Sequence, residues 1–135
     1  MLQKLLGALL ASLFVKYFIG YEGNLGANVP NHSYLLPLIC GIEVLASAFL
    51  MVAICIVVYV RGLRGFGGMM IGSIVGLDIF FLSFISGASM NPARSLAPAL
   101  LSGITNDLWI YWSATFIGTS FIALLFRGKF IKNIK

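Results

Sequence analysis

The sequence predicts an all-α membrane protein with four membrane-spanning helices and one re-entrant half-helix. Of the 135 residues, 60% are hydrophobic and only 10% are charged, and the mean hydropathy is +1.01. Soluble domains carry about 25% charged residues, so this composition excludes an ordinary soluble domain. Long apolar runs alternate with short polar connectors. One further stretch, just before the last run, is too rich in polar and small residues to span a membrane.

The charged residues indicate how the predicted helices are oriented. Nine basic and four acidic residues give a formal net charge of +5, and the basic residues lie mostly at the ends of apolar runs. They do not cluster on one surface, so we expect no nucleic-acid partner. Connectors rich in Lys and Arg stay on the cytoplasmic side of a membrane. The residues assigned to that side are Lys4, Arg61, Arg64, Arg127, Lys129, Lys132 and Lys135. We therefore predict a multi-pass protein of the cell membrane with both termini in the cytoplasm.

The predicted spans cover residues 2–19, 34–60, 66–85 and 108–126. The first is marginal in length, because a helix needs about 20 apolar residues to cross a bilayer. It begins like a secretory signal, but Lys16 interrupts it and aromatic residues follow, so we interpret it as a retained helix. The loop at residues 20–33 contains no Lys or Arg and is expected to face outward.

The third span carries two unusual features. Gly68, Gly72 and Gly76 recur every four residues on one helix face, which predicts a close crossing with another helix. Asp78 lies in mid-span, where a carboxylate is expected to face protein or water rather than lipid. The sequence does not identify its partner, and a local structural hydrogen bond and a pore-facing acid remain the alternatives.

Residues 86–101 predict a re-entrant loop followed by a half-helix. Asn91 is a favoured N-cap residue, and Pro92 fits the first helical position. Residues that favour helix continue to Leu101, which gives roughly 12–15 Å of helix at about 1.5 Å per residue. This reaches about half way through a hydrocarbon core of roughly 30 Å. Non-helical backbone at such depth is tolerated only where protein buries it or where it lines a watery cavity. The stretch therefore predicts a pore or a binding site.

The segment Ser-Gly-Ala-Ser-Met-Asn-Pro-Ala-Arg-Ser, residues 86–95, resembles the second signature loop of the aquaporin, or major intrinsic protein, family. The similarity extends through most of the chain, but it covers only the second half of the family's fold, from the third membrane helix onward. It implies that residues 1–135 form one partial aquaporin-like domain, a right-handed helical bundle. The first two spans and the first Asn-Pro-Ala loop of the family have no counterpart here.

The resemblance assigns roles to the residues of this loop. Asn91, Pro92 and Ala93 match the signature itself, and Arg94 matches the arginine that lines the family's narrow outer constriction. The N-terminus of a half-helix carries unsatisfied N–H groups and a partial positive charge, which disfavours cations in a pore. The amide donors of Asn91 would bind the oxygen of a passing water molecule.

The neighbouring positions bear on selectivity. Carbonyl groups of Gly87, Ala88 and Ser89 would face the channel as acceptors, because their backbone is not helical. Ile79 takes the place at which water-selective members carry a constriction histidine, and Ala88 takes another constriction position. Ser95 stands where many glycerol facilitators of the family carry aspartate. We therefore expect a wider and more apolar constriction that passes mainly water.

Glu43 lies inside the second predicted span, where a carboxylate is costly and normally has a partner. We expect it to accept hydrogen bonds from N–H groups of a loop that have no helical acceptor. The resemblance assigns it this role of supporting the signature loop. A proton relay is the alternative, although no second acid is placed to continue it.

Taken together, these residues imply a passive channel, or part of one, for water and small neutral solutes such as glycerol. The alternative is a non-conducting, truncated or degenerate subunit that needs a partner for the missing first half. The resemblance implies a lipid bilayer and a homotetramer as its surroundings. The sequence contains no nucleophile–base pair, metal-ligand set or phosphate loop, and its only histidine is His32. We therefore expect no enzyme, no cofactor and no metal site.

Overall fold

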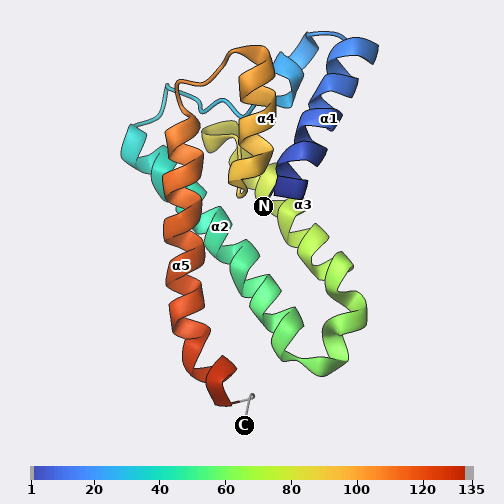
Figure 1. Ribbon diagram of the computed structural model, residues 1–135. Helices are drawn as coiled ribbons and strands as arrows, with labels where there is room; N and C mark the ends of the chain where they lie inside the picture. The colour runs from blue at the N-terminus through green and yellow to red at the C-terminus, as the bar shows by residue number, and fades with distance from the viewer. Residues whose placement is uncertain (1, 133–135) are drawn as a thin grey trace.

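The computed structural model describes residues 2–132, and its elements are helices joined by loops (Figure 1). The α-helices are α1 (Leu2–Phe18), α2 (Leu36–Tyr59), α3 (Gly67–Ser86), α4 (Pro92–Ser102) and α5 (Leu108–Lys132). Two short 3-10 segments, η1 (Glu22–Gly26) and η2 (Arg61–Phe66), lie in the connections. Between residues 2 and 132 there is no strand, and the predicted all-α fold is confirmed.

The structure describes only some of the basic side chains from which the membrane orientation is predicted. Lys135 lies outside the described residues, as do the side chains of Lys4, Arg61, Arg64, Lys129 and Lys132. Arg127 is exposed near the end of α5. The placement of both termini in the cytoplasm therefore stays a prediction from the sequence.

Three of the described helices are long and apolar enough to cross a membrane: α2, α3 and the part of α5 from Leu108 to Gly128. α1 is shorter, and its 17 residues measure about 26 Å at about 1.5 Å per residue, less than a hydrocarbon core of roughly 30 Å. It ends where Gly20 adopts a φ of +101° and donates its N–H to the carbonyl of Val15. The four predicted spans therefore correspond to three helices of full length and one shorter apolar helix.

α2 is the central element of the bundle. It packs against α5 and forms a hairpin with α3 through η2 (Figure 1). α1 packs against α4 at the end of the bundle away from η2, and α4 also contacts α5. Across the loops at this end, Nε2 of His32 lies 3.0 Å from Oδ2 of Asp107. The half-helix α4 thus packs between α1 and α5.

α2 and α5 approach closely because Gly118 has no side chain. A Cβ at this position would overlap the carbonyl oxygen of Val44 and would lie 3.1 Å from Cβ of Ser47. In the same contact, the Ser47 hydroxyl donates to Oγ1 of Thr115 at 3.4 Å, and both residues are buried. Small and hydroxyl side chains therefore allow the two backbones to meet, as in other membrane helix pairs.

The glycine face of α3 has no such contact within the described chain. Gly68, Gly72 and Gly76 are exposed, and nothing lies within 4 Å of a Cβ built at any of them. The close crossing predicted from their spacing is therefore wrong for the described part of this chain. The reason is that α3 packs against α2 on a different face, through Val75, which the spacing of glycines alone does not indicate.

We expect Gly118→Ala to lower the free energy of unfolding by about 1–3 kcal/mol, the usual cost of overpacking a tight contact. Gly128→Ala is the control on the same helix, because a Cβ there meets nothing within 4 Å. Its effect should be neutral or slightly stabilising, since alanine favours helix over glycine. Denaturant unfolding in detergent micelles, followed by circular dichroism, measures both variants. Equal stabilities of the two variants would contradict the role given to Gly118.

Candidate functional site

The site is built around the start of α4. Asn91 is its N-cap, with an extended backbone, and Oδ1 of Asn91 accepts the N–H of Ala93 at 3.0 Å. Pro92 occupies the first helical position, where its missing N–H costs nothing. The carbonyl of Asn91 accepts the N–H groups of Arg94 and Ser95 at 3.1 and 3.2 Å. The segment forms a helix of 11 residues, about 16 Å long at about 1.5 Å per residue.

The loop that precedes α4 is held by a buried carboxylate. Ala88 and Met90 have φ angles of 43° and 54°, left-handed values that cost a residue other than glycine about 1–2 kcal/mol each. The N–H of Ser89 donates to Oε1 of Glu43 at 3.0 Å, and the N–H of Met90 donates to Oε2 at 3.3 Å. Glu43 is fully buried. Successive N–H groups that converge on one anion form a backbone nest, so the carboxylate stabilises this strained loop.

A second anchor comes from the loop between α1 and α2. Nδ2 of Asn28 donates to the carbonyl of Gly87 at 2.7 Å, and Oδ1 of Asn28 accepts the hydroxyl of Ser95 at 3.1 Å. The hydroxyl of Ser95 also hydrogen-bonds the hydroxyl of Ser89. The Gly87 carbonyl, predicted to face a channel as an acceptor, therefore already has a donor from within the chain.

A third anchor comes from α5. Tyr111 is buried, and its hydroxyl donates to the carbonyl of Ser86, the last residue of α3, at 2.7 Å. The sequence gives no indication that Tyr111 or Asn28 belongs to the site. No local signal marks them, because their partners lie 25 and 59 residues away along the chain.

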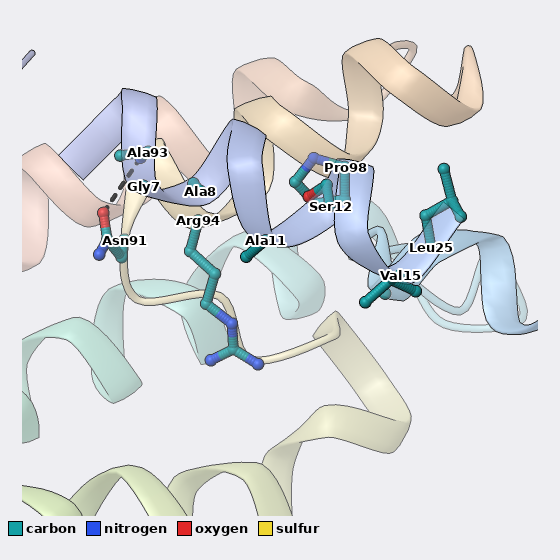
Figure 2. Close-up of a pocket in the computed structure, with 11 residues that line it drawn as sticks. Gly7, Ala8, Ala11, Ser12, Val15, Leu25, Asn91, Ala93, Arg94 and Pro98 are labelled. Carbon is teal, nitrogen blue, oxygen red and sulfur yellow. Dashed lines mark hydrogen bonds between the residues drawn. The ribbon is translucent and has the colours of Figure 1, made fainter. Parts of the chain in front are cut away.

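A cavity of about 400 Å³ lies between α1 and α4, and Asn91 and Arg94 both line it (Figure 2). Small residues of α1, among them Gly7 and Ala11, form the facing wall. The Asn91 oxygen is turned toward Ala93, which leaves the amide nitrogen on the other side (Figure 2). Asn91 and Arg94 of the signature segment thus line one common space.

Arg94 is exposed and extends away from α4 (Figure 2). Among the residues that the structure describes, no carboxylate forms an ion pair with it. A guanidinium that faces an open cavity offers several N–H donors to a ligand.

The two other residues predicted to form a constriction, Ile79 and Ala88, do not line this cavity. Ala88 is fully buried and belongs to an apolar cluster with Ala46 and Met90, and Ile79 packs against that cluster while half-buried. Ile79 and Ala88 therefore belong to the same apolar region, and their roles in a constriction stay a prediction. Neither lines the space that Asn91 and Arg94 share.

The chemistry of the site is that of a hydrogen-bond donor. The N-terminus of α4 contributes a partial positive charge, and Asn91 and Arg94 contribute side-chain donors to the same cavity. Such a site attracts the oxygen atoms of water and hydroxyl groups and repels cations. Among the described residues, no cluster of His, Cys, Asp and Glu could hold a metal ion.

Similarity to known proteins decides the family. Residues 1–126 match the family model described as major intrinsic protein. The chain belongs to this family. The similarity inferred from residues 86–95 is thereby confirmed, and the helices form a partial aquaporin-like membrane bundle.

Several relatives in the family align with this chain. Aquaporin TIP4-4 of Zea mays is 33% identical over 134 residues, which cover 95% of this chain and 52% of the relative. Nodulin-26 of Glycine max is 36% identical over 133 residues, or 97% of this chain and 46% of the relative. Aquaporin NIP3-1 of Arabidopsis thaliana is 53% identical over 58 residues, or 43% of this chain and 18% of the relative. The chain therefore spans about half the length of the first two relatives.

We expect Glu43→Ala to destabilise the loop, because it leaves the N–H groups of Ser89 and Met90 without an acceptor. Bonds to charged groups contribute about 1.5–3 kcal/mol each, so the loss of both bonds should lower the unfolding free energy by about 3–6 kcal/mol. Hydrogen exchange at residues 87–91 should rise in parallel. Glu43→Gln keeps an acceptor oxygen and should show a smaller effect. Unchanged protection of Ser89 and Met90 in Glu43→Ala would show that the carboxylate does not hold the loop.

Proposed function

We propose that this chain forms a passive membrane channel for water, or one half of such a channel. The observation that carries the proposal is the half-helix α4, whose Asn91 and Arg94 open into one cavity while Glu43 holds the preceding loop. A short helix that starts within a bundle of membrane helices needs a polar space at its N-terminus. The aquaporin names of two of the relatives support a water channel.

The geometry supports a mechanism of water passage in which hydrogen-bond donors at the start of α4 bind the oxygen of water. A water molecule at the start of α4 offers its oxygen to the amide nitrogen of Asn91, whose own oxygen is engaged by Ala93. Water held in this way cannot continue a hydrogen-bonded chain through its oxygen, so proton hopping is interrupted. The positive end of α4 and the Arg94 guanidinium repel hydronium and metal cations. The channel would therefore conduct neutral molecules without coupling to ions.

Selectivity follows from the residues near the loop. Ile79 and Ala88 are apolar and contribute no hydrogen-bond donor. They therefore neither attract ions nor restrict the channel to water alone. The hydroxyl of Ser95 is engaged by Asn28 and Ser89 and is not free for a polyol. We propose water as the main substrate, with small neutral solutes such as glycerol as the second class. No enzymatic activity is expected.

A closed pore needs more wall than the described chain provides. Arg94 is exposed, and the glycine face of α3 has no helix against it. We propose that the missing wall comes either from a homo-oligomer, such as the tetramer expected of the family, or from a partner that supplies the first half. The protein would be placed in the cell membrane with its termini cytoplasmic. The second candidate function is a non-conducting subunit. The exposed Arg94 and the uncovered glycine face of α3 in the described chain favour it.

Proteoliposomes that contain only this chain test the proposal by stopped-flow osmotic shrinkage. Water flux should exceed that of empty liposomes several-fold, with a low activation energy. Arg94→Ala should raise the permeability to glycerol or urea relative to water, because it removes charge and bulk from the cavity. Arg127→Ala, which removes an exposed arginine at the end of α5, should leave both fluxes unchanged.

Two outcomes would count against this proposal. Flux equal to that of empty liposomes would favour the non-conducting subunit, and co-reconstitution with the first half of a relative would then show whether a partner restores flux. Equal water and solute fluxes in the wild type and Arg94→Ala would remove Arg94 from the selectivity site.

A further inference from the structure

The chain contains a second buried carboxylate, and it lacks the partners of the first. Asp78 on α3 is only 5% exposed, and its Oδ2 has no hydrogen-bond partner among the described residues. Glu43 is also buried, but both of its oxygens accept backbone N–H groups. An unpaired buried carboxylate costs several kcal/mol, so proteins normally pair it with a donor or a cation.

The cations of the described chain do not provide that partner. The side chains of Lys16, Arg94 and Arg127 are described, and none of them forms an ion pair with Asp78. The ring of Tyr21 lies 5.1 Å from the ammonium of Lys16, and Arg94 belongs to the cavity beside α1. Asp78 is therefore available to a positive group from outside the described residues.

Asp78 also lines a cavity that is separate from the Asn91 site. This cavity, of about 310 Å³, lies between α2 and α3 and shares no lining residue with the cavity of Asn91 and Arg94. Its other lining residues are apolar: Phe49 of α2, and Ile74, Leu77, Phe81 and Leu82 of α3. Phe49 and Phe81 are half exposed, so the cavity opens on the outside of the helix pair.

We propose that this cavity binds a small organic cation, an ammonium group on a compact apolar body, with the charge against Asp78. The apolar walls suit the body of such a molecule, and the carboxylate is the single charged group of the lining. Phe49 and Phe81 can add cation–π attraction, which is stronger where water is excluded. The volume is at the lower end of the range of about 300–1,000 Å³ found for small-molecule sites.

Calorimetric titration of the purified 135-residue chain in non-ionic detergent micelles tests the proposal, with heats from empty micelles subtracted. The probe is cyclohexylmethylammonium, and its neutral counterpart of similar shape is cyclohexylmethanol. We expect saturable binding of the ammonium at one site per chain, at least tenfold tighter than binding of the alcohol. Equal affinities for the ammonium and the alcohol would overturn the proposal. They would mean either that both probes only partition into an apolar groove or that the carboxyl of Asp78 keeps its proton.

Variants locate the site. Asp78→Asn keeps the shape of the side chain and should weaken ammonium binding at least tenfold. Asp107→Asn removes a carboxylate from the loop near His32 and should leave binding unchanged. Leu77→Trp fills the cavity without changing charge and should also weaken binding at least tenfold, which keeps the test decisive if Asp78→Asn does not fold. Unchanged binding in a folded Asp78→Asn or in Leu77→Trp would exclude this cavity as the site.

Discussion

The pair of hydrogen bonds from the backbone of Ser89 and Met90 to Glu43 is the interaction on which the rest of the site depends. A membrane interior offers no water to a loop, so every N–H of the loop needs an acceptor from the protein. Glu43 supplies two such acceptors from the central helix α2. Since Met90 directly precedes the N-cap Asn91, the position of α4 follows from that of the carboxylate. The donors of Asn91 and Arg94 reach their common cavity only because this loop is fixed.

The same physical constraint separates the two buried acids of the chain. Glu43 replaces its lost hydration with backbone donors, and it therefore serves the fold. Asp78 has one oxygen without a partner and an apolar cavity beside it, so its hydration is not replaced within the described chain. A buried charge without such partners is the feature on which the proposed binding role of Asp78 rests. The two acids lie on neighbouring helices of one hairpin, yet their surroundings give them different chemistry.

Local residue types predicted much of this structure. The N-cap at Asn91, the proline at the first helical position and the length of the half-helix follow from short-range rules, and the structure agrees with each. Long-range partners could not be predicted in that way. Asn28 and Tyr111 reach the loop from other elements, and nothing in their neighbouring sequence indicates these contacts. The glycines of α3 predicted a helix contact that the described chain does not contain, because glycine spacing indicates a possible close approach but does not indicate which helix is present.

The sequence by itself determined the class of the protein, the three long membrane helices and the half-helix between the last two of them. These properties depend on apolar runs, caps and turns, which act over a few residues. Only the tertiary structure decided that α1 packs on α4, that Asn28 donates to the Gly87 carbonyl, and that Ile79 packs against the apolar cluster that contains Ala88. It also decided that Oδ2 of Asp78 has no hydrogen-bond partner among the described residues and that Asp78 lines a cavity. The physical reason is that burial and pairing of polar groups depend on which distant elements come together in space, and residue types along the chain do not encode that choice in any local pattern.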